Sequence, residues 1–332
     1  MNLNNLEDRK EDAKSLGFSE KTIAQIEENM RLGVPQFKAY DSMPATGKGQ
    51  IDYTLNFKKS AQSDYYYWNS FQAVHNKVDP LEPGQKYMVI TKGEDGKNMV
   101  KKLDNVNEAI DLFKKQNGNA ELSIGKDPAH KNMVANMENG KVNFVAKTFQ
   151  AAYYANPTPQ TFYIEEGRGF NKEQAGNMVQ KRAVFRDDLL NSNGIIYQAW
   201  LMLNTDKPRD RNGNYELKTY HVPNYGFDLK ESLDKYNIKG LEDPEKAEKV
   251  YASIKNGNRV LVTAERKDGE TLSVFVEAAV RWGKINFTLE NGKPEKREEF
   301  LKPEIQKNVS QSGQTVRQTV ENNQNEGVAL GR

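Results

Sequence analysis

The residues whose types and spacing first suggest chemistry are 167–170, Gly-Arg-Gly-Phe. They stand between a predicted strand (161–166) and a predicted helix (172–181), which is where dinucleotide-binding turns occur. The third glycine of that fingerprint is missing, because Lys172 occupies its position, and the Gly-Lys-Ser/Thr of a P-loop is also absent. We therefore expect no nucleotide cofactor. Arg168 is left as a candidate for an anion or backbone-phosphate contact.

The same stretch also has a structural explanation. Glycine permits the positive φ angles of a tight turn. Asn171 and Gln174 have the spacing of a helix capping box, in which each side chain bonds the backbone of the other residue. A capped strand-to-helix turn is the interpretation we favour, and the anion contact is the alternative.

A second stretch, residues 64–74, is rich in aromatic side chains. Strand-like alternation places Tyr65 and Tyr67 on the same face as Phe71, and Trp68 on the opposite face. One interpretation is a strand packed on both faces, with tyrosine hydroxyls reaching its edge. The other is a platform on which bases stack, because such platforms combine aromatic and basic side chains. Four lysines are near this stretch in the sequence: Lys48, Lys58, Lys59 and Lys77.

Basic residues further along the chain would extend such a surface. Arg209 and Arg211 stand at the tip of a predicted hairpin, and Lys181 and Arg182 follow the helix after the Gly-Arg-Gly turn. With Arg168 they form a basic patch if the fold brings them together. Hairpin tips are also often charged simply because they face water. The candidate nucleic-acid-binding residues are Arg168, Lys181, Arg182, Arg209, Arg211, Tyr65, Tyr67 and Trp68.

Side chains suited to enzyme chemistry are sparse. The three histidines are far apart and share no motif, so we expect no metal site. The chain has no cysteine and no Gly-x-Ser-x-Gly elbow. Adjacent carboxylates such as Asp187 and Asp188 would diverge on a strand. We therefore expect no catalytic residues, no metal and no cofactor.

The composition gives little indication of a partner. The 332 residues carry 48 basic and 46 acidic side chains, and a net charge of +2 argues for neither a nucleic-acid nor a membrane partner. No window approaches the roughly 18 apolar residues that a membrane span needs. The N-terminus lacks the pattern of a secretory signal, and the absence of cysteine fits a reducing compartment. We expect a cytoplasmic protein without a membrane partner, and the oligomeric state stays open.

The predicted elements divide the chain into four parts and favour an α+β fold with mostly antiparallel sheets and short helices. The parts are an N-terminal helical hairpin with aromatic-rich strands (1–80), an inserted ββαβ unit with a linking strand (81–155), an α+β domain with the Gly-Arg-Gly signature (156–300) and a disordered tail (301–332). Within the insertion, Asp104 or Asn105 is expected to cap the helix. Residues 141–155 are expected to form a further aromatic-rich strand.

Several motifs, in order along the chain, resemble a family of Bacteroidetes proteins. They are MNLNNLEDRKEDAKSLGF, YTLNFKKSAQSDYYYWNSFQA, GRGFNKEQAGNMVQKRAVFRDDLLNSNGIIYQAWLMLN, NGNYELKTYHVPNYGFDLKESLDKY and EDPEKAEKVYASIKNGNRV. The resemblance covers residues 1–74 and 161–290, and residues 75–160 depart from the family pattern. The family occurs on conjugative elements, plasmids and related mobile DNA, as domains of unknown function. The resemblance implies an accessory or cargo protein of a mobile genetic element in the bacterial cytoplasm, and it supplies no catalytic residues.

These observations lead to three hypotheses about function. We expect a non-enzymatic protein that associates with nucleic acid through the aromatic strand and the basic residues. The alternative is a protein-binding or inhibitory module that acts on a host or element-encoded protein through the insertion and the tail. An enzyme would require polar groups that converge in a pocket.

Overall fold

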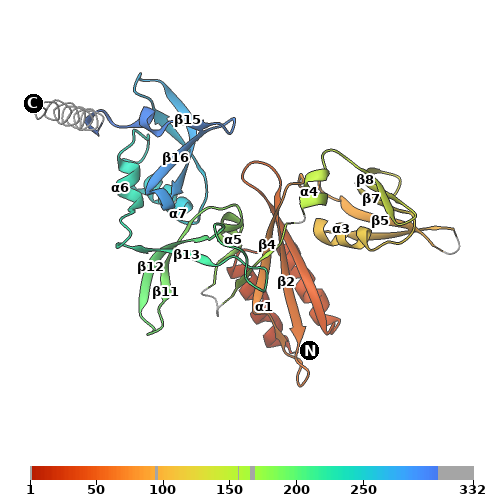
Figure 1. The fold of residues 1–332 in the computed structure, drawn as a ribbon. Helices are drawn as coiled ribbons and strands as arrows, with labels where there is room; N and C mark the ends of the chain where they lie inside the picture. The colour runs from red at the N-terminus through yellow and green to blue at the C-terminus, as the bar shows by residue number, and fades with distance from the viewer. Residues whose placement is uncertain (1, 94–95, 156, 165–168, 306–332) are drawn as a thin grey trace, which may run out of the picture. The chain divides into compact units, whose positions relative to one another are not determined.

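The computed structural model describes residues 2–93, 96–155, 157–164 and 169–305. Its helices are short, and its strands form four antiparallel sheets (Figure 1). These features confirm the expected α+β class. The tail expected from the sequence lies outside the described residues from position 306 onward.

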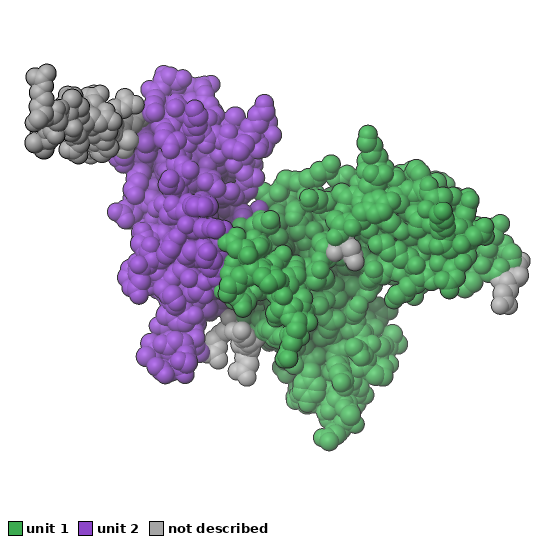
Figure 2. Space-filling view, viewed as in Figure 1, with its two compact units in different colours: residues 1–181, 203–217 green, residues 182–202, 218–332 purple. Residues whose placement is uncertain are grey.

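The chain divides into two compact units, which Figure 2 shows in different colours. The first unit comprises Met1–Lys181 and Leu203–Leu217, and the second comprises Arg182–Met202 and Lys218–Arg332. The four-part division expected from the sequence stays a prediction.

The first unit begins with the expected helical hairpin, which packs on a sheet. Helices α1 (Leu3–Ser15) and α2 (Glu20–Arg31) start at Asn2 and Ser19, whose side chains accept backbone N–H bonds. Gly17, with φ +84°, ends the first helix. The strand order of the sheet is β1-β2-β4-β10, and the short strand β3 also pairs with β2. The bounds are β1 (Gln36–Pro44), β2 (Gln50–Lys59), β3 (Tyr66–Tyr67), β4 (Ser70–Asn76) and β10 (Gln160–Tyr163).

Alternate residues of β2 form the core between this sheet and its helices. The buried residues are Ile51, Tyr53, Leu55 and Phe57. Helix α5 (Lys172–Val179) packs on the same face, where the hydroxyl of Tyr53 donates to the carbonyl of Lys172 at 2.8 Å. Gly176 permits this close approach, because a Cβ atom there would lie 2.3 Å from the Tyr53 hydroxyl oxygen.

The capping box expected at the start of α5 is confirmed. Asn171 Oδ1 accepts from the backbone N–H of Gln174 at 2.8 Å, and Gln174 Oε1 accepts from the backbone N–H of Asn171 at 3.4 Å. The two bonds satisfy amide groups that the first turn of a helix leaves without partners.

The insertion forms a sheet of its own within the first unit. The expected ββαβ order is confirmed, and the strand order is β6-β5-β7-β8-β9. The elements are β5 (Lys86–Lys92), β6 (Asn98–Leu103), α3 (Val106–Lys114), β7 (Ala120–Gly125), β8 (Lys131–Glu138) and β9 (Lys141–Val145). Asn105 caps α3 by accepting from the backbone N–H groups of Asn107 and Glu108.

The linking strand expected at 141–155 is only partly correct. The strand ends at Val145, and helix α4 (Gln150–Ala155) follows. Phe149, Ala152 and Tyr153 have helical spacing, and all three are buried in the core beneath the inserted sheet. The aromatic residues therefore stabilise a helix against this core instead of extending a strand.

The second unit combines two sheets around one core. The first sheet has the order β11-β12-β13, and the second has the order β14-β15-β16-β17. The strands are β11 (Val184–Leu190), β12 (Ile196–Leu203), β13 (Leu217–Val222), β14 (Val260–Glu265), β15 (Thr271–Ala279), β16 (Lys284–Leu289) and β17 (Pro294–Glu295). The helices are α6 (Leu229–Asp234) and α7 (Pro244–Lys255), with 3₁₀ turns η2 (Val280–Trp282) and η3 (Arg297–Phe300). Asp243 caps α7 by accepting from the backbone N–H groups of Glu245 and Lys246, and Gly269, with φ +86°, stands in the turn between β14 and β15.

Candidate nucleic-acid interface

The sheet β1-β2-β4-β10 has two contrasting faces. One face packs against α1, α2 and α5, and the other carries mostly polar residues. Residues opposite each other in an antiparallel pair point to the same side, so the strand register defines this polar face. Its exposed end consists of Lys38, Asn56, Lys58, Tyr67, Ser70 and Tyr163. Its covered end consists of the buried residues Gln50, Asp52, Val74 and Asn76.

Tyr67 and Tyr163 are the aromatic side chains of the exposed end. Their exposed fractions are 55% and 57%. Tyr163 lies opposite Ser70 on β4, and the backbone N–H of Ile164 donates to the carbonyl of Asn69 at 3.0 Å, so β10 runs beside the segment between β3 and β4. The two rings therefore project from nearby strands on one side of the sheet. Single-stranded bases stack on exposed rings of this kind.

Trp68, a candidate from the sequence, is buried on the opposite side. It is 2% exposed, and its ring lies 5.2 Å from Phe57 and 5.9 Å from Phe18 between ring centroids. A ring enclosed by core residues offers no free face to a base. Trp68 therefore belongs to the core and not to the interface.

The alternation expected along this aromatic stretch holds only as far as Trp68. Tyr65 and Tyr67 are exposed, whereas Tyr66 and Trp68 are buried, so the two pairs face opposite sides as the alternation predicts. The chain then leaves the strand between β3 and β4, and Phe71 is completely buried on the helix side. The expected placement of Phe71 with the exposed tyrosines is wrong, because the break shifts the alternation by one residue.

Tyr65 stands at the rim of the exposed end. It is 42% exposed and directly precedes β3. The loop that leads to it borders a hollow of about 760 Å³, with Lys58, Lys59 and Asp64 in its wall. Lys59 pairs with Asp64 at 2.7 Å, whereas Lys58 forms no ion pair among the described residues. Lys58 lies opposite Tyr67 in the strand pairing, so both side chains leave the sheet on the same side.

The charge of the polar face changes along the strands. The exposed end carries Lys38 and Lys58 and no acidic residue, whereas the covered end carries Asp52. Lys38 also pairs with Glu108 of the insertion at 3.0 Å. The exposed end is therefore weakly basic, which suits a polyanion whose bases supply part of the binding energy.

Arg209 has a structural role in the first unit. Its guanidinium donates to the carbonyl of Thr158 at 2.8 Å, to that of Pro159 at 3.2 Å and to that of Gly213, and it lies over the ring of Tyr215 at 4.2 Å. These bonds tie the loop between β12 and β13 to the segment that precedes β10. Arg209 is thus at the other end of β10 from Tyr163.

The other described basic candidates, Lys181, Arg211 and Arg182, do not lie together at the exposed end of the sheet. Lys181 is exposed and lines a small pocket of about 210 Å³ together with Arg209. Arg211 is exposed in the turn that holds Gly213, so the expected turn is confirmed. Arg182 belongs to the second unit, where its Nε donates to the carbonyl of Gly257 at 2.7 Å and burial lowers its pKa to about 10.

Arg168 lies outside the described residues, as do its neighbours at 165–167. Its role as an anion contact stays a prediction.

Two residues of the exposed end, Tyr163 and Lys38, are not among the candidates from the sequence. Tyr163 alternates with the buried Phe162, which indicates the outward face of β10, and Lys38 alternates with Phe37 and Ala39 in the same way. The alternation was visible in the sequence. The pairing of β10 with β4, across the whole insertion, was not.

The fold and this face define the molecule as an α+β protein with a tyrosine-bearing polar sheet face. Comparisons with models of protein families, with curated proteins and with solved structures found no match. In the part of the chain that the structure describes, no helix has the length and apolar character needed to cross a membrane. Within the same residues, no three His, Asp or Glu side chains gather where they could hold a metal ion.

Proposed function

We propose that the exposed end binds single-stranded nucleic acid without enzymatic chemistry. The observation that carries the proposal is the pair Tyr67 and Tyr163, more than half exposed on one face of a sheet and accompanied by the unpaired Lys58. Each ring offers a surface for one base, and every base has a stacking face, so binding tolerates different sequences.

Polar groups between the two tyrosines suit the sugar–phosphate backbone. Asn56 and Ser70 lie on the same face, and their amide and hydroxyl groups donate hydrogen bonds to phosphate or sugar oxygens. Lys58 and Lys38 add positive charge at the same end. Duplex DNA keeps its bases stacked inside the helix, so a platform of this kind discriminates in favour of single strands.

The experiment is a fluorescence anisotropy titration of labelled oligothymidylate, with the matching duplex as comparator. We expect binding to the single strand to weaken as salt rises. Tyr67→Ala and Tyr163→Ala are each expected to weaken it by roughly 5- to 150-fold, because stacking contributes about 1–3 kcal/mol per base.

Tyr154 supplies the matched control. It is 67% exposed on α4, away from the exposed end of the sheet, so Tyr154→Ala removes an exposed tyrosine elsewhere in the same unit. Equal losses in Tyr154→Ala and Tyr67→Ala would count against the proposal. So would an absence of binding to any single strand at low salt.

The resemblance to proteins of mobile genetic elements supports a biological setting for this activity. Conjugative transfer and related processes expose single-stranded DNA, and an accessory protein with a stacking platform fits that setting. The bacterial cytoplasm is the compartment that this proposal requires.

One observation in the second unit favours protein binding as a second function. Leu190, Ile195 and Ile196 are 43%, 60% and 66% exposed at the tip of the β11–β12 hairpin. Asn191 Oδ1 accepts from the backbone N–H groups of Asn193 and Ile195, both at 2.9 Å, so the turn is held in one conformation. Exposed aliphatic side chains on a fixed turn suit a protein partner. Capture of a host protein that Ile195→Ser/Ile196→Ser abolishes would support it, and unchanged capture would reject it.

A further inference from the structure

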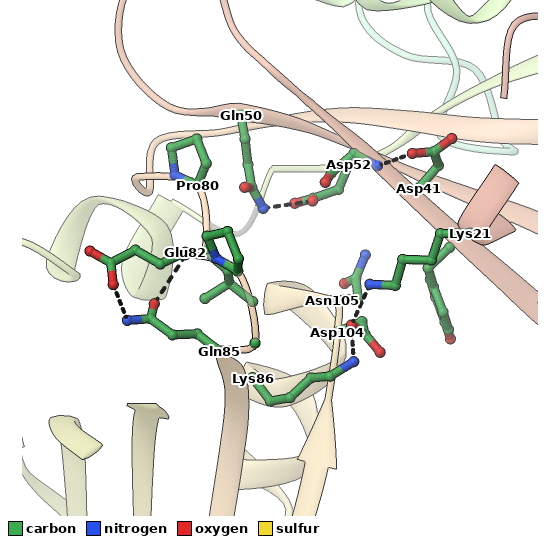
Figure 3. Close-up of a pocket in the computed structure, with 15 residues that line it drawn as sticks. Lys21, Asp41, Gln50, Asp52, Pro80, Glu82, Gln85, Lys86, Asp104 and Asn105 are labelled. Carbon is green, nitrogen blue, oxygen red and sulfur yellow. Dashed lines mark hydrogen bonds and ion pairs between the residues drawn. The ribbon is translucent and has the colours of Figure 1, made fainter. Parts of the chain in front are cut away.

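A pocket of about 530 Å³ lies at the covered end of the same sheet, between the strands and the insertion (Figure 3). Tyr40, Gln50 and Asp52 line it from the sheet, and Glu82, Lys86 and Asp104 line it from the insertion. Figure 3 shows Gln50 and Asp52 on one side of the cavity and Glu82, Lys86 and Asp104 on the other. All of these residues belong to the first unit.

Asp52 is unusual among the residues that line the pocket because its carboxylate is buried and, in the part of the chain that the structure describes, is hydrogen-bonded only by neutral amides. It is 3% exposed, and Gln50 Nε2 donates to its Oδ1 at 2.7 Å while Asn76 Nδ2 donates to its Oδ2. Both partners are neutral amides, and Asp52 forms no ion pair among the described residues. A buried carboxylate without a counter-ion is unfavourable, and a cation that enters the pocket would compensate its charge.

The two lysines that line the pocket are both engaged by Asp104, another residue of its wall. Lys21 pairs with Asp104 at 3.1 Å, and Lys86 also pairs with Asp104. Glu82 accepts from Gln85 Nε2 at 3.0 Å, which leaves its charge without a cationic partner as well. Of the four carboxylates in the lining, Asp41 pairs with Lys172 at 3.0 Å and Asp104 pairs with the two lysines, which leaves Asp52 and Glu82 without an ion pair among the described residues. The excess of acidic groups favours a positively charged occupant.

We propose that this pocket binds the cationic nitrogen group, an ammonium or a guanidinium, of a small organic ligand, with Asp52 as the counter-ion. Gln50 and Asn76 hold the carboxylate in place through its two oxygens, which leaves further lone pairs for a charge-assisted hydrogen bond to the ligand. Tyr40 supplies an aromatic side chain to the wall, which suits a cation. The group reaches the pocket either as a free amine or as a lysine or arginine side chain of a short peptide.

Isothermal titration calorimetry of the full chain tests the proposal. The probes are n-butylammonium and n-butylguanidinium as free cations, n-butanol as the neutral analogue, and the capped peptide acetyl-Gly-Arg-Gly-amide. We expect at least one of the cations to bind and n-butanol not to bind. Binding of the free cations alone identifies a small-molecule site, and tighter binding of the peptide identifies a peptide side chain as the source.

Asp52→Asn removes the charge and keeps the shape, and it should weaken cation binding by roughly tenfold or more. Glu138→Gln, at an exposed position of β8, is the control and should leave binding unchanged. Equal affinity in wild type and Asp52→Asn, or no binding of any cationic probe, would overturn the proposal. Oligonucleotide binding by Asp52→Asn should match that of the wild type, so this test is independent of the proposed function.

Discussion

The exposed end and the covered end of the polar face of the sheet β1-β2-β4-β10 differ in burial and charge, although only a few residues of the same strands separate them. On β2, Lys58 and Asn56 are exposed, whereas Asp52 and Gln50, on the same face, are buried. The exposed end carries tyrosines and lysines, and the covered end carries a carboxylate held by amides beside the insertion. Strand alternation is the same at both ends, so the difference comes from what lies against the sheet. The insertion thus divides one face into the surface that we propose for a polyanion and the pocket that we propose for a cation.

The largest expected effect is on the free energy of unfolding, and it distinguishes Trp68 from its neighbour Tyr67. Trp68→Ala should lower the free energy of unfolding by about 3–5 kcal/mol, because it empties a core position between Phe18 and Phe57. Tyr67→Ala should change it by less than about 1 kcal/mol, because that ring is more than half exposed. Chemical denaturation measures both. Similar losses in the two variants would contradict the assignment of Trp68 to the core and Tyr67 to the surface.

Replacement of Asp52 gives the next largest effect on stability, and the size of that effect depends on pH. Burial raises the pKa of Asp52 to about 6, from an ordinary value of 3.8, although bonds from Asn76 and Gln50 oppose the shift. The folded state therefore binds the proton more tightly than the unfolded state, and this group lowers stability as pH rises from about 4 to about 6.

Asp52→Asn removes this dependence. We expect the variant to be more stable than the wild type at pH 8, by up to about 3 kcal/mol, and the gain to shrink towards pH 4. Thermal or chemical unfolding at a series of pH values measures the difference. A variant that is less stable than the wild type at pH 8 would show that the amide bonds to the carboxylate outweigh the cost of its burial.

The sequence groups Arg209 and Arg211 as nucleic-acid contacts, whereas the structure gives Arg209 a structural role. Alanine variants of the two residues distinguish these assignments. Arg209→Ala should lower the free energy of unfolding by about 1–3 kcal/mol, because three carbonyl groups lose a charged donor. Arg211→Ala should leave stability within about 0.5 kcal/mol of the wild type, because Arg211 is exposed in a turn. We expect neither change to weaken oligonucleotide binding as much as Tyr163→Ala. A larger loss from Arg211→Ala would move the interface to the loop between β12 and β13.

Lys58 gives the smallest expected effect. Lys58→Ala should reduce the dependence of oligonucleotide affinity on salt by about one phosphate contact, a change of roughly 0.7 in the slope of log K against log salt. Lys267→Ala, in the second unit, is the control and should leave that slope unchanged. Equal slopes in wild type and Lys58→Ala would show that this ammonium group does not contact the backbone.

Much of the fold could be predicted from local sequence patterns, and the interface only in part. The capping box at Asn171, the cap of α3 and the opposite facing of Tyr67 and Trp68 each depend on a few neighbouring residues, and all are confirmed. Phe71 was placed on the wrong face because a break between β3 and β4 shifts the side-chain alternation. Trp68 was a wrong candidate because alternation puts it opposite Tyr67 without showing which of the two faces is buried. Tyr163 was missed because its pairing with β4 is formed across the insertion.

The pocket beside Asp52 was equally hidden from the sequence. Gln50 and Asp52 lie on β2, whereas Lys86 and Asp104 lie in the insertion, and only tertiary packing brings them together. Burial distinguishes Asp52 from the other acidic residues that the structure describes, and burial at this position depends on the neighbouring β strands and the insertion. A residue's type therefore indicated its capacity for chemistry but not its environment.

The most direct test of the central claim is photocrosslinking of a single-stranded oligothymidylate to the full chain, followed by mass spectrometry of the crosslinked peptides. The account predicts crosslinks at Tyr67 and Tyr163, with none at Trp68 or at the covered end. Crosslinks confined to the second unit or to the loop that carries Arg211 would contradict it.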